Sequence, residues 1–345
     1  MSAALSANRF VKEDSFNNFD TLRIFAALLV FFSHSFPLTY GSDAAEPLFR
    51  LTHGRSTIGH LGLILFFVVS GYLVTRSFLR SGSSVRFLLA RGLRLLPGLA
   101  VALILTAGLL GAAVSTEPLP SYFASGKLWL FFGRNLSLLP RYDALPGVFT
   151  ANPFPHAVAG SLWTLHYEAA CYFGVLLLGV TRLLNKWAVG CLMVAAMIGA
   201  ALAKGGSYAG LGAFFLGGGV ILLFEVPLRG WVAGLSAGLF AGSLGLGGTA
   251  VVLPVTGAYV VLYLALSPAV RLPRLARWGD LSYGIYNLCL AGAAARDDAA
   301  GPASELVAYD RAVAAGRSWT GLAVVASGRE AGADAEDCRA RQGTA

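Results

Sequence analysis

Apolar runs of about twenty residues alternate with short polar segments along most of this chain. Eight runs cover residues 22–40, 60–79, 95–115, 160–180, 187–203, 208–225, 231–249 and 251–269, and a ninth begins near Leu281. Runs of this length match the hydrocarbon core of a bilayer. Because each span in lipid must satisfy its own backbone hydrogen bonds, helices are expected throughout. The pattern predicts an all-α, polytopic membrane helical bundle of about eight to nine spans.

Basic residues concentrate in every second short segment between these runs. The groups are Arg76, Arg80, Arg86, Arg91 and Arg94, then Arg182 and Lys186, then Arg229, and finally Arg271, Arg274 and Arg277. An excess of lysine and arginine in short loops marks the cytoplasmic side of a membrane protein. The N-terminus is therefore expected in the cytoplasm.

The composition supports a membrane protein and argues against other classes. Of the 345 residues, 56% are hydrophobic and only 13% are charged, whereas about a quarter of a soluble domain is charged. The net charge of +8 is spread over the loops rather than gathered in one patch, so no nucleic-acid partner is expected. The four cysteines show no metal-ligand spacing, and no metal site is predicted. The first apolar run lacks a cleavage site and is expected to remain as a span.

Two stretches differ from the repeating pattern. The segment 116–159 is long and rich in proline and aromatic residues, and either a functional loop or a packing segment on the membrane surface would explain it. Residues 291–345 contain eight acids, six arginines and no lysine, and no part of them could span a bilayer. They are either a polar, disordered tail or the product of a reading-frame shift near Asn287. Two regions are predicted: a transmembrane domain, 1–290, and an atypical tail, 291–345.

Ionisable residues inside spans are costly to bury, and each is a candidate for function. Arg23 and His34 lie eleven positions apart in the first run, which is about three helical turns or about 16 Å. Both side chains are therefore expected on one face, which could hold a long anionic ligand at one end and react at the other. The alternatives are a snorkelling anchor for Arg23 and a packed interfacial histidine for His34.

Glu168 lies in the fourth run, within "GSLWTLHYEAACYF". Counted from the start of that run, its depth matches that of His34. An isolated carboxylate at this depth would be unfavourable unless it had a partner, and a histidine would provide one. A His34–Glu168 pair would form a general base with an orienting carboxylate, suited to activating a hydroxyl group.

Two further motifs flank these candidates. Ser70 and Gly71 are small residues within the second run, where they either allow close helix packing or help to shape a site. Arg91 and Arg94 precede the third run, with Pro97 expected near its helix start. Two guanidinium groups at a membrane boundary suit phosphate binding, and they equally suit a purely topological role.

Taken together, five motifs in this order resemble the acyltransferase-3 family of membrane O-acyltransferases. They are "FDTLRIFAALLVFFSH" (19–34), "GLILFFVVSGYL" (62–73), "RFLLARGLRLLP" (86–97), "GSLWTLHYE" (160–168) and "LSYGIY" (281–286). The resemblance covers residues 15–286. It implies about ten transmembrane helices in the bacterial inner membrane, whereas this chain shows eight to nine.

The resemblance also implies an activity and a site. Family members transfer an acyl group, commonly acetyl from acetyl-CoA, to a hydroxyl of a surface polysaccharide, lipopolysaccharide or related glycan. The implied catalytic residues are His34 and Glu168, and the implied substrate-binding residues are Arg23, Ser70, Gly71, Arg91, Arg94 and Trp163. Acyl-CoA is the expected donor, a glycan or lipid-linked sugar the acceptor, and membrane lipid the surroundings. No bound cofactor is expected.

Two alternatives to an active enzyme arise from the same residues. Buried arginine, histidine and glutamate also occur in transporters and flippases, although this chain shows no internal repeat. The atypical C-terminal region leaves an inactive, truncated remnant as the other alternative.

Overall fold

The computed structural model describes residues 17–139, 144–150, 162–203, 208–246 and 249–273. All regular elements among them are helices, joined by short turns. The α-helices are α2 (Phe19–Tyr40), α3 (Pro47–Leu51), α4 (Ile58–Ser81), α5 (Ser84–Leu103), α6 (Gly111–Val114), α7 (Leu119–Ala124), α8 (Gly126–Leu136), α9 (Leu165–Val180), α10 (Lys186–Leu202), α11 (Tyr208–Leu223), α12 (Gly230–Leu246) and α13 (Thr249–Leu266). The predicted all-α membrane bundle is confirmed.

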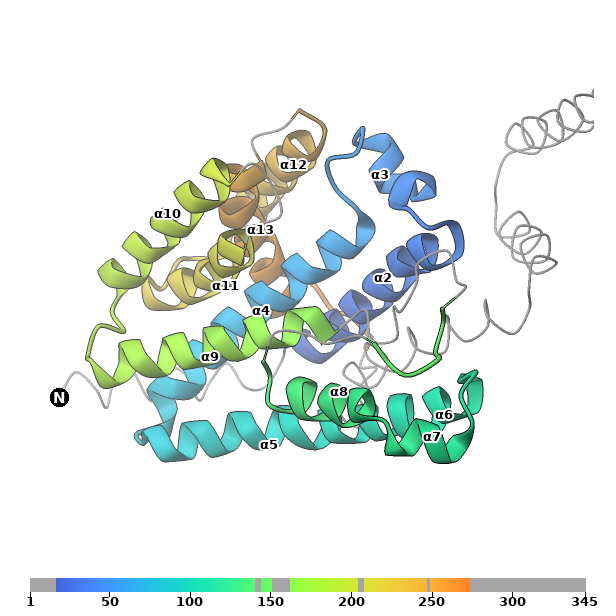
Figure 1. Ribbon diagram of the computed structural model, residues 1–345. Coiled ribbons are helices and arrows are strands. Elements are labelled where there is room, and N and C mark those ends of the chain that lie inside the picture. The colour runs from blue at the N-terminus through green and yellow to red at the C-terminus, as the bar shows by residue number, and fades with distance from the viewer. Residues whose placement is uncertain (1–16, 140–143, 151–161, 204–207, 247–248, 274–345) are drawn as a thin grey trace, which may run out of the picture. The chain divides into compact units, whose positions relative to one another are not determined.

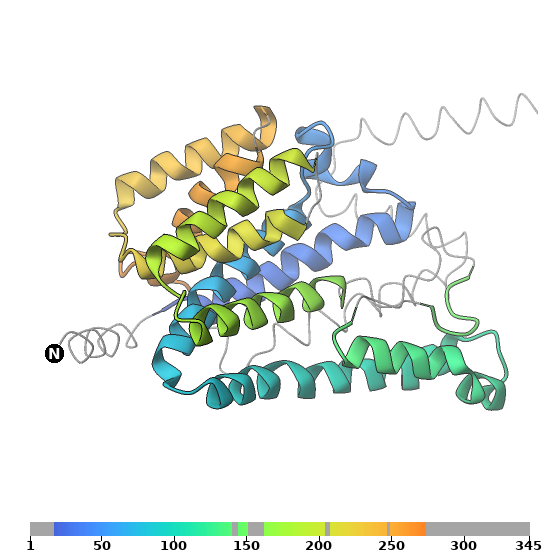
Figure 2. The same ribbon diagram turned by 60° about the vertical axis from the view of Figure 1, so that its left-hand side comes forward.

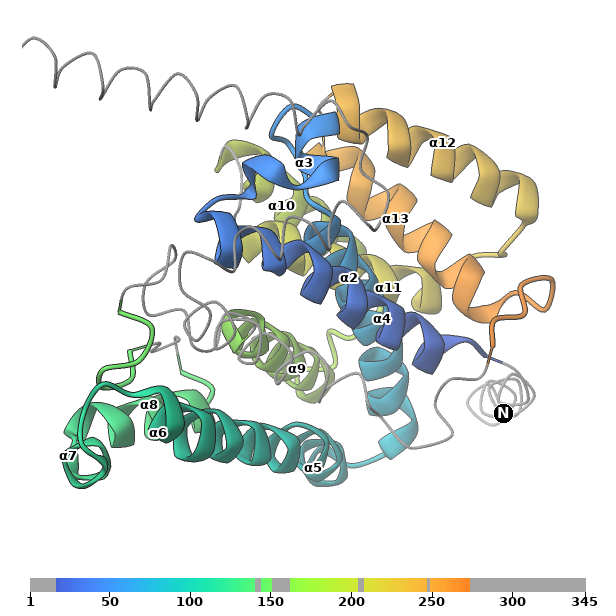
Figure 3. The same cartoon turned by 90° about the vertical axis from the view of Figure 1, so that its right-hand side faces the viewer.

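Helix α4 is the centre of the described bundle. It packs most extensively on α11 and α2, and it also contacts α13, α9 and α5 (Figures 1 and 3). Its start is set by Thr57, whose side chain accepts a hydrogen bond from the backbone N–H of His60 at 3.1 Å. Its end is set by Gly82, which takes a left-handed conformation with φ of 59° and needs no Cβ to be accommodated there. Because α4 lies at the centre of the bundle, the helices that contact it are the ones that can contribute to a buried site.

Helix α2 runs antiparallel to α4. A Cβ atom at Gly59 would lie 2.9 Å from the Ser33 hydroxyl, and one at Gly62 would lie 2.7 Å from the Ala26 carbonyl oxygen. At the other end of the pair, the ring of Phe19 stacks on that of Tyr72 at 5.7 Å. The small residues of α4 thus let α2 approach closely.

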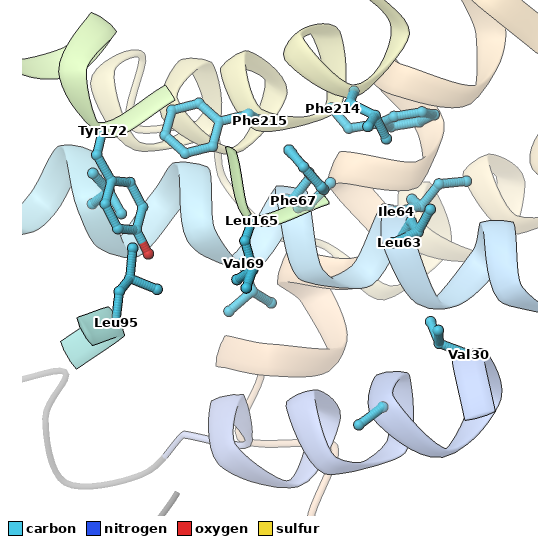
Figure 4. Packing of buried hydrophobic residues seen from close by; sticks show 14 of the residues in the cluster. Val30, Leu63, Ile64, Phe67, Val69, Leu95, Leu165, Tyr172, Phe214 and Phe215 are labelled. Atoms are coloured by element: carbon cyan, nitrogen blue, oxygen red, sulfur yellow. The ribbon is translucent and has the colours of Figure 1, made fainter. Parts of the chain in front are cut away.

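A second close approach joins α4 to α11. A Cβ atom at Gly71 would collide with the carbonyl oxygen of Phe215, and one at Gly218 would collide with that of Val68. Aromatic and aliphatic side chains pack around this seam, including Phe214, Phe215, Phe67 and Ile64 (Figure 4). The packing alternative for Gly71 is thereby supported, because the two backbones touch at this residue.

The third span begins earlier than its hydropathy predicted. Helix α5, the π-helical stretch Ile104–Leu110 and α6 form one rod from Ser84 to Val114. Pro97 lies inside this helix rather than at its start. The prediction of a start near residue 95 was wrong because the first turns of α5 are amphipathic, with Phe87 buried and Arg86 outside, and a search for apolar runs passes over amphipathic turns.

Arg76 was predicted among the basic residues after the second run, although the run 60–79 itself includes it. It lies inside α4, and only 8% of its surface is exposed. The position within the helix is therefore the correct one, and its placement in the loop was wrong.

The long segment after residue 115 contains two helices, α7 and α8. Helix α8 lies along α5, as Figures 1 and 2 show, and buries Leu128, Phe131 and Asn135. Tyr122 of α7 is fully buried and donates a hydrogen bond to the carbonyl oxygen of Ala107 at 2.6 Å. Residues 119–136 therefore contribute packing to the bundle, and a functional role of this segment stays a prediction.

Within the described residues, three helices have the length and composition of membrane spans: 19–40, 58–81 and 84–114. Shorter apolar helices over 186–202, 209–223, 230–246 and 250–266 match the fifth to eighth predicted spans. The ninth span near Leu281, the domain boundary at 290/291 and the tail lie outside the described residues.

Candidate functional site

Glu168 lies in the first turn of α9 and faces the middle of α4. The Ser70 hydroxyl donates a hydrogen bond to its Oε1 at 3.2 Å, and the Tyr172 hydroxyl donates to the same oxygen at 2.5 Å. The start of a helix also stabilises a carboxylate through the helix dipole. Glu168 is therefore held within the bundle by two neutral donors and by its own helix.

Two arginines of α5 lie near Tyr172, the tyrosine that contacts this carboxylate. The guanidinium carbon of Arg91 stands 5.8 Å from the centre of the Tyr172 ring, within the range of a cation–π contact. Arg94 is exposed but still close enough to interact electrostatically with Tyr172. Figure 4 shows Tyr172 reaching from α9 toward Leu95 of α5. The structure thus brings together Ser70 of α4 and Glu168 of α9, and it places Arg91 of α5 over the ring of Tyr172, which contacts the same carboxylate.

His34 lies toward the other end of α4, on α2. Its Nδ1 stands 2.9 Å from the carbonyl oxygen of Val30, one turn earlier in the same helix. A Cβ atom at Gly59 would lie 3.7 Å from the same Nδ1, so the imidazole sits against the second residue of α4. Since a carbonyl oxygen can only accept a hydrogen bond, Nδ1 is the donor in this contact, and in the neutral imidazole the lone pair then lies on Nε2.

The expected direct pair of His34 with Glu168 is not what the described residues show. Gly59 marks the level of His34 along α4, and Ser70 marks that of Glu168. Eleven residues of continuous helix separate the two levels, about 16 Å at 1.5 Å per residue. The prediction that Glu168 and His34 lie at equal depth was wrong. Helix α9 begins only at Leu165, and its first turn therefore lies opposite the middle of α4.

Arg23 lies closer to Glu168 than to His34 along the bundle. Phe19 meets α4 at Tyr72 and Val30 meets it at Gly62. Arg23 falls between these two contacts, within about one helical turn of the level of Ser70. Its side chain is half-buried. Arg23 and His34 therefore lie at two different levels along the pair of helices α2 and α4.

Trp163 precedes α9 in a short 3₁₀ turn, Leu162–Thr164, and is half-buried. Its ring meets that of Tyr167 edge-on at 5.8 Å. In the described residues it belongs to the aromatic packing at the start of α9, and a role in substrate binding stays a prediction.

Sequence reasoning missed several polar residues at or near these sites. Tyr172 follows Glu168 by four positions, and this spacing on a helix was a usable signal. His60 accompanies the His34 end of α4, with its Nδ1 3.0 Å from the Ser56 hydroxyl. No sequence pattern indicated Glu46, because its role depends on tertiary contacts.

Glu46 joins two helix starts near the His34 end. Its side chain is fully buried, and its two oxygens accept hydrogen bonds from the backbone N–H groups of Phe49 and Ile58. These groups belong to the first turns of α3 and α4, where backbone donors lack partners within their own helices. Glu46 thereby fixes the start of α4 against which His34 packs.

Comparison with known proteins identifies the family of this chain. A family model described as an acyltransferase domain matches residues 16–288. A protein named O-acetyl transferase from Shigella phage Sf6 is 33% identical over 156 residues, covering 45% of this chain and 44% of its own. Nodulation protein 10 from Rhizobium leguminosarum bv. viciae is 31% identical over 187 residues, covering 50% of this chain and 45% of its own.

The chain thus spans less than half the length of the curated relatives it matches. No solved structure matches it. The family model, by contrast, covers the described helices α2 to α13 and every candidate residue discussed above. On this basis the chain belongs to the acyltransferase-3 family of membrane acyltransferases.

Proposed function

We propose that this protein is a membrane O-acyltransferase that moves an acyl group, acetyl in the simplest case, from acyl-CoA to a hydroxyl group of a cell-surface glycan. The acceptor would be a polysaccharide, a lipopolysaccharide or a lipid-linked sugar. Membership of the acyltransferase family supports the reaction type. The name O-acetyl transferase of the phage relative supports oxygen as the acceptor atom. The proposed location is the bacterial inner membrane, with a cytoplasmic N-terminus.

The observation that carries the proposal is the orientation of His34. The carbonyl oxygen of Val30 accepts from Nδ1, so that the neutral form of this imidazole carries its basic lone pair on Nε2. An imidazole in this tautomer is suited to accept a proton from a hydroxyl group. The backbone of α2 thereby orients the imidazole of His34, a role that had been predicted for Glu168.

The proposed reaction takes place at Nε2 of His34. The nitrogen accepts the proton of the acceptor hydroxyl as its oxygen attacks the thioester carbonyl carbon. The carbon–sulfur bond then breaks, and the CoA sulfur leaves with the electron pair and takes the proton. Alternatively, His34 would hold the acyl group transiently before passing it to the acceptor.

The positions of the arginines along the helix bundle fit an elongated acyl donor. Arg91, Arg94 and Arg23 would bind the phosphates of acyl-CoA, since guanidinium groups bind phosphate oxygens in pairs. These groups lie toward the middle or the Ser81 end of α4, whereas His34 lies toward Ile58. The separation suits a donor whose charged end and reactive end are joined by a long arm.

Replacing His34 tests the proposal. Membranes containing His34→Ala should transfer no radiolabelled acetyl group from acetyl-CoA to surface glycan, although the protein is inserted in normal amount. His53→Ala is the matched control, because His53 is an exposed histidine in the turn after α3. Normal transfer by His34→Ala would refute the mechanism. A wild-type protein that yields no acylated product but moves a solute would favour the transporter alternative instead.

A further inference from the structure

We infer that Glu168 is a substrate-binding group whose second oxygen, Oε2, accepts a hydrogen bond from a neutral N–H or O–H group of a substrate, and that Tyr172 positions it to do so. The inference rests on the proposed function, because it names what the carboxylate in the middle of the bundle would bind. It also gives a role to Tyr172, which the reaction at His34 does not use.

The hydrogen bonds of this carboxylate are distributed unequally. The Ser70 and Tyr172 hydroxyl groups both donate to Oε1. Among the described residues no donor is directed at Oε2, and Glu168 is half-buried rather than enclosed. A carboxylate accepts hydrogen bonds on both oxygens, and burial without such bonds is unfavourable. Oε2 is therefore the acceptor that a bound molecule can use.

Tyr172 is built to hold the carboxylate in one orientation. Only 5% of its surface is exposed, and its ring packs in the core beside Leu95 of α5 (Figure 4). Arg91 lies over the ring, and the Nε of this arginine is buried with no hydrogen-bond partner in the described part of the chain. The tyrosine hydroxyl thus comes from a buried, packed ring, and it selects Oε1 of Glu168 as its acceptor, which leaves Oε2 for another donor.

The charge of Glu168 selects the class of group that binds. A carboxylate repels phosphate, so the phosphates of a donor belong at the arginines and not at Oε2. Amide N–H groups and hydroxyl groups are neutral donors that suit a carboxylate. The pantetheine arm of acyl-CoA carries amide N–H groups, and a sugar acceptor carries hydroxyl groups. Both present the same chemistry to Oε2.

The decisive variant is Tyr172→Phe, which removes the hydroxyl and keeps the packed ring. It is measured as the full-length protein in membranes, with labelled acetyl-CoA and the membrane glycan as acceptor. Loss of a hydrogen bond to a charged group should lower kcat/KM about tenfold. A higher KM for acetyl-CoA identifies the donor arm as the ligand of Oε2. A higher KM for the glycan acceptor, with the KM for acetyl-CoA unchanged, identifies the acceptor hydroxyl. Ser70→Ala, which removes the other donor to Oε1, should change the same parameter.

A double-mutant cycle separates positioning from a merely structural role. In a Glu168→Gln background Tyr172→Phe should cause little further loss, because residues that act through one another are not additive. Tyr263→Phe in α13, a tyrosine remote from Glu168 in the helix order, is the matched control and should keep wild-type kinetics. Full activity of Tyr172→Phe, or losses that multiply in the double variant, would overturn this inference while the wild-type enzyme still transfers acetyl. Absence of transfer by the wild type would instead refute the proposed function.

Discussion

At the scale of single residues, the local hydrogen-bond partners decide what each polar side chain can do. His34 is oriented by the Val30 carbonyl oxygen, and Glu168 by the hydroxyl groups of Ser70 and Tyr172. The two ionisable groups that motif reasoning joined into a pair therefore have separate partners. Each motif residue had been found in the sequence, but their pairing depended on where α9 starts relative to α4.

Gly71 provides a prediction at this scale. Gly71→Ala should destabilise the folded protein by about 1–3 kcal/mol or more, because the added methyl group would collide with the Phe215 carbonyl oxygen. Thermal unfolding in detergent would measure the loss. Gly212→Ala in α11 is the matched control, since a Cβ atom there meets no atom within 4 Å. The control should be neutral or stabilising by up to about 1 kcal/mol, as alanine favours helix. Equal melting temperatures of the two variants would contradict the packing role.

At the scale of elements, the ends and irregularities of helices depend on contacts that hydropathy does not report. Helix α5 extends eleven residues before the predicted start at residue 95, and its continuation includes the π-helical stretch 104–110. A π-helix alters the backbone hydrogen bonds of its turn. The fully buried Tyr122 donates to Ala107 within that stretch. An element distant from the site thus sets the shape of the rod that carries Arg91.

Tyr122 provides a pH prediction at this scale. Burial raises the pKa of its hydroxyl from 10.0 to about 12. Because the folded-state pKa is the higher one, the stabilisation is complete below pH 10 and is lost as the pH rises from 10 toward 12. Unfolding measured in detergent across this range should show the loss. Tyr122→Phe should be less stable at neutral pH by about 1 kcal/mol, the contribution of one hydrogen bond, and should lack this alkaline component. A variant that keeps the component would assign it to another group.

At the scale of the whole described bundle, the first helix is tied to the segment after α13. The Asn18 side chain donates to the carbonyl oxygens of Leu264 and Val270 at 2.7 and 2.8 Å and accepts from the N–H of Leu272 at 3.3 Å. The Thr21 hydroxyl adds a bond to the Pro273 carbonyl oxygen at 2.7 Å. These contacts join residues about 250 positions apart and bring both ends of the described chain beside α4, which contacts α2 and α13.

Asn18 provides the prediction at this scale. Asn18→Ala should lower the free energy of unfolding by about 1–3 kcal/mol, because it leaves buried backbone groups without partners. Protease resistance of the protein in detergent should fall with it. Asn17→Ala is the matched control, since Asn17 is exposed and, within the described residues, its side chain accepts a single bond, from the N–H of Phe19 at 3.4 Å. If both variants resisted protease as the wild type does, the contact would not contribute to closure of the bundle.

The sequence by itself determined the fold class, the approximate positions of the spans and the polar residues on them, because hydropathy and the cost of burying charge act along the chain. Tertiary structure alone decided the register between helices. It placed His34 and Glu168 about three turns of α4 apart, buried Arg76 within the bundle, and brought Tyr172 to the Glu168 carboxylate, with Arg91 over the tyrosine ring. The physical reason is that register depends on where close contacts such as Gly71 against Phe215 allow two backbones to meet, and those contacts exist only once the helices have packed.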